Sequence, residues 1–149
     1  MEVGKLSTTD TICCSRDESV QGAALLMRKH HVGDLVVVEE PDGERIPVGI
    51  VTDRDIVVSV IALGLDPLGL QVGDIMTDDL LTTTEDDDVY ATIERMRLRG
   101  IRRVPVVNAA GGLTGIVSAD DLLEFLADEM SELSRISGHQ QAHEKTARH

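Results

Sequence analysis

The chain carries one pattern of apolar and polar positions, and that pattern occurs twice. In the first half, an amphipathic segment beginning at Val20 precedes two runs rich in β-branched residues, 35–38 and 48–51. Val20, Ala24 and Met27 are spaced i, i+4, i+7, which predicts a helix with one buried face. The two runs are bounded by Gly and Asp, which predicts a pair of strands joined as a hairpin.

The second half of the chain is a copy of the first. A shift of 69 residues places Val20 on Val89, and beyond the turn Pro41-Asp42-Gly43 the shift becomes 66. Insertions are accommodated in turns, so the change of offset supports the alignment. We therefore expect an α/β (α+β) fold of two tandem β-α-β-β-α repeats, residues 1–67 and 68–130. A unit of this size is marginal alone, so the two should pack against each other with pseudo-twofold symmetry.

The two ends of each repeat are less regular. Short opening strands are expected at 11–14 and 80–83, and closing helices at 53–63 and 119–130. The segment 131–149 is polar and loses the apolar period, which predicts a flexible, frayed or disordered C-terminal tail.

Composition removes several classes of function. The chain has 149 residues and a net charge of −13, so it should repel nucleic-acid phosphates. Aromatic residues make up 1%, too few for base-stacking platforms. The sequence lacks an apolar run that could span a membrane or serve as a signal peptide. The adjacent cysteines Cys13 and Cys14 form no disulfide framework or metal motif, so a cytoplasmic location is expected.

Two matched segments at strand-to-helix junctions are the candidates for chemistry, Thr52-Asp53-Arg54-Asp55 and Ser118-Ala119-Asp120-Asp121. A hydroxyl residue followed three positions later by Asp is close to a capping box, so both segments can be explained as helix caps alone. The same geometry also suits a nucleotide. Helix N–H groups and the hydroxyl can meet a phosphate, while the carboxylate one turn on accepts from both ribose hydroxyls. Its duplication favours a binding site.

The repeat resembles the cystathionine-β-synthase-type (CBS) domain, and the tandem is similar to stand-alone bacterial CBS pairs. The matching residues are Val72-Gly73-Asp74-Ile75-Met76-Thr77, Gly100-Ile101-Arg102-Arg103-Val104-Pro105-Val106-Val107 and the two Gly-Ile-Val-(Thr/Ser)-x-x-Asp segments, within about residues 3–130. The resemblance implies clefts between the repeats that bind AMP, ADP, ATP, S-adenosylmethionine or related ligands. It also implies homodimers, a sensing or regulatory role, and no catalysis.

The resemblance further implies roles for individual residues. Asp55 and Asp121 would hold ribose hydroxyls, and Thr52 and Ser118 would meet phosphate or ribose. The remaining lining residues would be Thr11, Ile12, Val32, Gly33, Asp34, Leu35, Leu81, Thr82, Ile101, Arg102, Arg103, Val104 and Pro105.

The residue before the ribose carboxylate differs between the copies. It is Arg54 in the first, where it can help to neutralise a phosphate, and Asp120 in the second, where it would repel one. We therefore predict unequal sites, with the one containing Thr52, Arg54 and Asp55 better suited to charged nucleotides.

Three function classes are weighed on these grounds. The leading hypothesis is an adenosine-ligand sensor that requires no cofactor or metal and acts on an unidentified regulated protein. The alternative is a ligand-independent oligomerisation or interaction scaffold, in which the duplicated carboxylates only cap helices. An enzyme ranks third, because the sequence offers no recognisable Ser/His/Asp, Cys/His or metal constellation.

Overall fold

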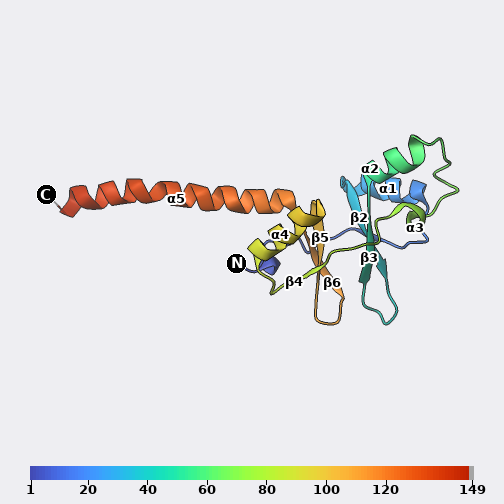
Figure 1. The fold of residues 1–149 in the computed structure, drawn as a ribbon, viewed down its shortest axis with the longest axis horizontal. Helices are drawn as coiled ribbons and strands as arrows, with labels where there is room; N and C mark the ends of the chain where they lie inside the picture. Colours follow the sequence, from blue (N-terminus) through green and yellow to red (C-terminus); the bar gives the residue numbers. More distant parts are fainter. Residues whose placement is uncertain (148–149) are drawn as a thin grey trace.

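Two three-stranded sheets, one from each repeat, form the body of the protein (Figure 1). In this computed structural model, which describes residues 1–147, the strands are β1 (Cys13–Cys14), β2 (Asp34–Glu39), β3 (Ile46–Thr52), β4 (Thr83–Thr84), β5 (Arg103–Val107) and β6 (Leu113–Ser118). The sheet orders are β1-β2-β3 and β4-β5-β6. In each sheet the first strand runs parallel to the second, and the second pairs antiparallel with the third.

The helices complete the predicted β-α-β-β-α order in both repeats, which confirms the α/β fold class. They are α1 (Val20–His30), α2 (Asp53–Ile56) with a π-helical continuation η2 (Val57–Ile61), α3 (Val72–Ile75), α4 (Val89–Arg99) and α5 (Ala119–Ala147), and a 3-10 turn η1 (Val3–Lys5) begins the chain. The buried residues of α1 are Val20, Ala23 and Met27, so its buried face turns slightly from the predicted one, with Ala24 only half-buried.

The opening segments of the two repeats are exchanged. Val3 of the first repeat is fully buried in the core of the second, and the N-terminus lies beside α4 (Figure 1). Val72 of the second repeat is fully buried in the core of the first. The Val3 N–H donates to the Asp87 carbonyl at 2.9 Å, and the Val72 N–H donates to the Glu18 carbonyl at 2.8 Å. Residues 67 and 68 therefore mark the boundary between the two sequence repeats. That the same boundary also separates two folding units stays a prediction.

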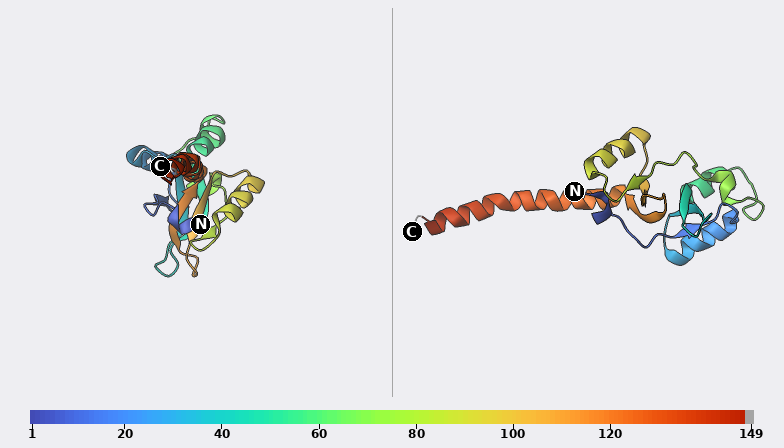
Figure 2. Two further views of the ribbon diagram at one scale, coloured as in Figure 1. Left: turned by 90° about the vertical axis from the view of Figure 1, so that its left-hand side faces the viewer. Right: turned by 90° about the horizontal axis from the view of Figure 1, so that it is seen from below.

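The last helix corrects an expectation. A helix ending at Met130 was predicted, but α5 continues to Ala147 and projects from the body (Figures 1 and 2). The segment 131–147 contains no proline, and Glu132 pairs with Arg135 at 3.2 Å across one helical turn. Leu133 and Ile136 also continue the apolar spacing beyond Met130, so the helix end predicted at Met130 is wrong. Arg148 and His149, also assigned to the tail, lie outside the described residues.

None of the helices formed by residues 1–147 has the length and apolar composition needed to cross a membrane. Within the same residues, no group of three or more His, Cys, Asp or Glu side chains is arranged to hold a metal ion.

Candidate functional site

Two clefts lie between the repeats, and each draws residues from both. The Thr52 cleft, of about 370 Å³, is lined by Ile50, Thr52, Asp53, Arg54, Thr77, Asp79, Leu80, Leu81, Ile101, Arg102 and Arg103. The Ser118 cleft, of about 330 Å³, is lined by Thr8, Asp10, Thr11, Ile12, His31, Val32, Gly33, Asp34, Arg103, Ile116, Ser118 and Asp121. Both volumes fall in the range of small-molecule sites.

Backbone bridges between the repeats explain why the clefts are shared. Thr8 forms a bridge with Ile116, and its repeat equivalent Thr77 forms one with Ile50, each through two hydrogen bonds of 2.9–3.0 Å. Gly115 precedes Ile116 and allows this approach, because a Cβ at that position would stand 2.8 Å from the Thr8 carbonyl oxygen. The segment before each opening strand is therefore held against the last strand of the other repeat.

Both candidate carboxylates form capping boxes. Asp55 Oδ2 accepts from the Thr52 N–H at 2.9 Å, and Asp121 Oδ2 accepts from the Ser118 N–H at 3.0 Å. The hydroxyls of Thr52 and Ser118 accept from the Asp55 and Asp121 N–H groups, each at 3.1 Å. Helix capping therefore explains one oxygen of each carboxylate. Asp121 nevertheless lines the Ser118 cleft, whereas Asp55 is not one of the residues lining the Thr52 cleft.

An ion pair between the repeats includes a residue that the two clefts share. Arg103, which lines both, pairs through Nε with Asp34 Oδ2. The two residues occupy equivalent positions of the repeat, 69 apart, so the pair lies where the copies face each other. The Asp34 side chain is only 16% exposed, and this burial raises the pKa of its carboxyl while the Arg103 guanidinium opposes the rise.

The clefts differ in charge. Three arginines and two aspartates line the Thr52 cleft; the arginines are Arg54, Arg102 and Arg103. The Ser118 cleft has Arg103 against three aspartates. Asp120 does not line either cleft, because its carboxylate pairs with Arg102 at 3.1 Å. The Thr52 cleft is therefore the more favourable of the two for an anion.

The remaining residues proposed from the sequence take different positions. The side chains of Leu35 and Val104 are fully buried in the two cores and Pro105 is also buried, so only their backbones could meet a ligand. Thr82 is half-buried, and its carbonyl accepts from Arg95 Nη1 at 3.5 Å.

Sequence reasoning missed several lining residues of the two clefts. They are Thr8, Asp10, His31 and Ile116 in the Ser118 cleft, and Ile50, Asp53, Thr77 and Asp79 in the Thr52 cleft. Thr8 and Thr77 are equivalent under the 69-residue shift, and Ile50 and Ile116 under the 66-residue shift. The repeat could therefore have indicated both pairs.

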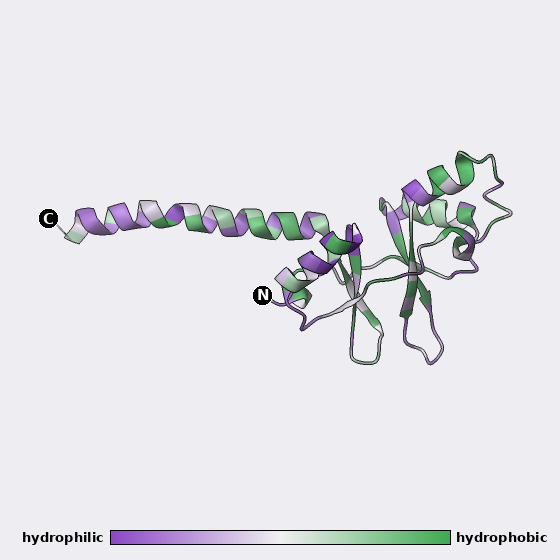
Figure 3. Ribbon diagram, in the orientation of Figure 1, coloured by the Kyte–Doolittle hydropathy of each residue, from purple (hydrophilic) through white to green (hydrophobic). Residues whose placement is uncertain are grey.

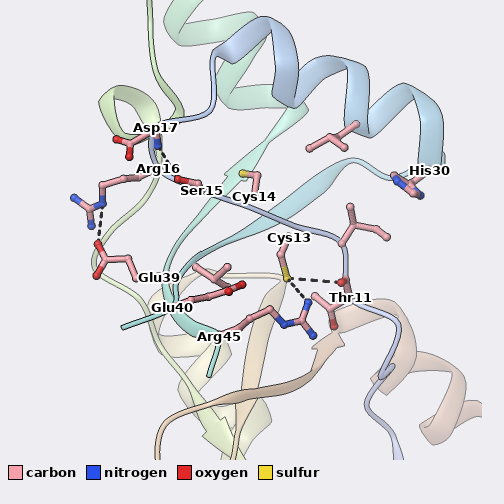
Figure 4. Close-up of a pocket in the computed structure, with 13 residues that line it drawn as sticks. Thr11, Cys13, Cys14, Ser15, Arg16, Asp17, His30, Glu39, Glu40 and Arg45 are labelled. Atoms are coloured by element: carbon pink, nitrogen blue, oxygen red, sulfur yellow. Dashed lines mark hydrogen bonds and ion pairs between the residues drawn. The ribbon is translucent and has the colours of Figure 1, made fainter. Parts of the chain in front are cut away.

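A third hollow, of about 740 Å³, lies beside β1 and is built from the first repeat alone (Figure 4). Cys13 Sγ accepts from Arg45 Nη1 at 3.4 Å and contacts the Thr11 carbonyl, while Arg16 pairs with Glu39 at 3.1 Å. Burial raises the pKa of the Cys13 thiol against the opposing Arg45 charge, and raises that of Cys14 to about 11. Both thiols are therefore protonated near neutral pH, which disfavours nucleophilic chemistry.

Comparison with known proteins places this geometry in a family. The family model of the CBS domain matches residues 3–61 and 72–128. An uncharacterized protein of Methanopyrus kandleri, MK0525, is 37% identical over 83% of this chain, which spans 62% of that relative's length.

Two solved structures share the fold and carry adenosine ligands. The CBS domain protein PAE2072 from Pyrobaculum aerophilum, complexed with AMP, has a TM-score of 0.73 at 29% identity, over 82% of this chain and 90% of its own. The CBS domain pair of protein MJ0100, complexed with 5′-methylthioadenosine and S-adenosyl-L-methionine, has a TM-score of 0.73 at 27% identity, over 87% of this chain and 98% of its own. The duplicated unit, its shared clefts and the two family matches lead to one conclusion: this chain belongs to the CBS domain family and contains two CBS domains in tandem.

Proposed function

We propose that this protein binds adenosine-containing ligands in the clefts between its two CBS domains and acts as a sensor or regulatory module. The observation that carries the proposal is the construction of each cleft. A capped strand-to-helix junction from one repeat meets the opening segment of the other. A ligand bound there touches both repeats, so binding would alter their relation. The ligands of PAE2072 and MJ0100 support the adenosine class.

The charge difference divides the ligands between the clefts. In the Thr52 cleft, Arg54 lies in the first turn of α2, and Arg102 and Arg103 line the same cleft although each is already paired with an aspartate. This excess of arginines favours a phosphate. In the Ser118 cleft the excess of carboxylates favours an uncharged or cationic adenosine compound. We therefore propose that AMP prefers the Thr52 cleft and that 5′-methylthioadenosine or S-adenosylmethionine prefers the Ser118 cleft.

Titration calorimetry with AMP and with 5′-methylthioadenosine tests this division. Arg54→Gln should weaken AMP about tenfold, by about 1.4 kcal/mol, and leave 5′-methylthioadenosine unchanged. Arg103→Gln should weaken AMP too, and it should also change binding of 5′-methylthioadenosine because Arg103 lines both clefts. Arg28→Gln, exposed on α1, is the matched control. Equal loss of both ligands in Arg54→Gln would refute the division, and no heat with either ligand would refute the binding function.

The formed capping boxes favour the scaffold as the second candidate. In that case Asp55→Ala costs about 1 kcal/mol of unfolding free energy, and calorimetry shows no binding of either ligand.

The proposed function also includes a regulatory partner, a homodimer and a role without catalysis. Exposed apolar residues of η2, including Val57 and Ile61 at 57% and 58% exposure, support self-association. The free thiols of Cys13 and Cys14 support a reducing, cytoplasmic location.

A further inference from the structure

The outer part of α5 lies away from the rest of the described protein. Every residue from 127 to 147 is exposed, and Leu122 is the buried residue of the helix. Figures 1 and 2 show this part extending away from both sheets. In proteins most helical stability comes from packing of an apolar face, and Gly138 lowers the intrinsic helix propensity of this segment. A partner surface would therefore stabilise it.

An apolar stripe follows α5 out of the body. Leu123, Leu126, Met130 and Leu133 are separated by three, four and three residues, and Ile136 follows three residues later. The first four positions have the spacing of a coiled-coil seam, and Ile136 lies beside the seam, one residue before its next position at Ser137. Exposure is 61% for Leu123, 71% for Met130, 65% for Leu133 and 59% for Ile136. In Figure 3 the hydrophobic positions of α5 lie in the half nearer the body.

The inner end of the stripe joins an apolar groove between α4 and α5. The groove has a volume of about 320 Å³ and is lined by Ile93, Met96, Arg97, Gly100, Ile101, Ala119, Leu122, Leu123 and Leu126. Leu123 and Leu126 thus belong to both the groove and the stripe. An apolar side chain placed between them would continue the core of the second repeat.

Charge along α5 selects the direction of a partner helix of the same sequence. Residues 119–132 contain six acidic side chains and no basic one. Residues 133–147 contain Arg135, Lys145, two histidines and a single acid, Glu144. A parallel pair would place the two acidic halves together. An antiparallel pair that overlaps the apolar stripes sets each acidic half beside residues 127–140 of the other copy, which carry three acids and Arg135 and so repel it less.

We propose that α5 forms an antiparallel coiled coil with α5 of a second copy of this chain. In the register that overlaps the two stripes, Leu126 faces Leu133 of the second copy and Leu123 faces its Ile136. Ile136 of each copy then lies at the α4–α5 groove of the other. This surface meets the ligand clefts only at Ile101, which also lines the Thr52 cleft, and the pairing does not depend on the proposed function.

Disulfide cross-linking in a Cys13→Ser, Cys14→Ser background tests the pairing and its direction. Leu126→Cys and Leu133→Cys are prepared separately, then mixed and oxidised. The mixture should give about ten times more linked dimer than either variant alone. Ser131→Cys, on the opposite face of the helix, is the matched control and should give only the background amount. Strong linking of Leu126→Cys with itself would indicate a parallel pair and overturn the proposal.

A second measurement keeps the test independent of cysteine substitution. Circular dichroism of the unmodified protein should lose the helix of residues 131–147 on dilution, as the pair dissociates. Leu133→Glu with Ile136→Glu should show that loss already at high concentration, while Ser131→Glu should not. Helix content that ignores both dilution and the double substitution would overturn the proposal. If the mixed cysteine variants also gave no cross-linked dimer, constant helix content would show that α5 stays helical without pairing.

Discussion

The two repeats share one backbone plan but differ in their interiors. In the first repeat, Cys14 and Leu26 are apolar residues on facing parts of β1 and α1. Their equivalents in the second repeat are Thr83 and Arg95. Arg95 Nη2 donates to Thr83 Oγ1 at 3.1 Å and to Asp87 Oδ2 at 3.3 Å, and the Thr83 hydroxyl donates to Asp87 at 2.6 Å. One fold therefore accepts either an apolar contact or a hydrogen-bonded ionic network here.

The clefts extend this difference to the surface. Equivalent positions hold Arg54 in one repeat and Asp120 in the other, and Gly33 in one and Arg102 in the other. Because Asp120 pairs with Arg102, the second repeat satisfies its added charges internally. The duplicated plan therefore preserves the shape of the two sites while their charge diverges.

The largest expected effect comes from substitutions in the two cores. They test whether the two repeats differ in stability and unfold separately. Leu35 and its equivalent Val104 are both fully buried. Leu35→Ala should cost about 3 kcal/mol, and Val104→Ala less, because it removes fewer carbon atoms. Since Val3 and Val72 are exchanged between the cores, both variants should unfold in a single transition on urea titration. Two separated transitions would show that the repeats unfold independently.

A smaller effect is expected from Arg95, where the interiors differ most. Arg95→Leu should destabilise the protein by about 2 kcal/mol in urea titrations, because Asp87 and Thr83 lose a donor. Adding Thr83→Cys and Thr92→Ala, which restores the set found in the first repeat, should recover much of that loss. Arg97→Leu, exposed on the same helix, should change stability by no more than about 0.5 kcal/mol. A triple variant less stable than Arg95→Leu would show that the two interiors are not interchangeable.

Most of the elements could be predicted from the sequence because each has its own period, and the internal repeat tested every assignment twice. Period shows which residues are buried but not in which core, so the exchange of Val3 and Val72 was not foreseen. The period also does not show which polar side chains find hydrogen-bond partners in distant parts of the chain. Helical spacing places Arg95 outside the apolar face of α4, where a solvated side chain would be predicted, yet it is half-buried in a network. The pairing of Arg102 with Asp120 likewise depends on three-dimensional placement.

The smallest effect is a pH dependence that only the second repeat's network should produce. The hydrogen bond from the Thr83 hydroxyl, with that from the Thr84 N–H and the charge of Arg95, lowers the pKa of Asp87 to about 2. A carboxyl whose pKa is lower folded than unfolded stabilises the protein above its unfolded pKa of about 3.9. That contribution is lost as the pH falls from about 4 through about 2. It should be smaller than the Arg95→Leu effect, because the Asp87 side chain is 38% exposed.

Urea midpoints at pH 5 and pH 3 should therefore differ less in Asp87→Asn than in the unmodified protein. Asp86→Asn, at an exposed neighbouring residue, should leave the difference unchanged. Equal differences in all three proteins would mean that the network contributes no pH dependence, and that the repeats respond alike to acid despite their different interiors.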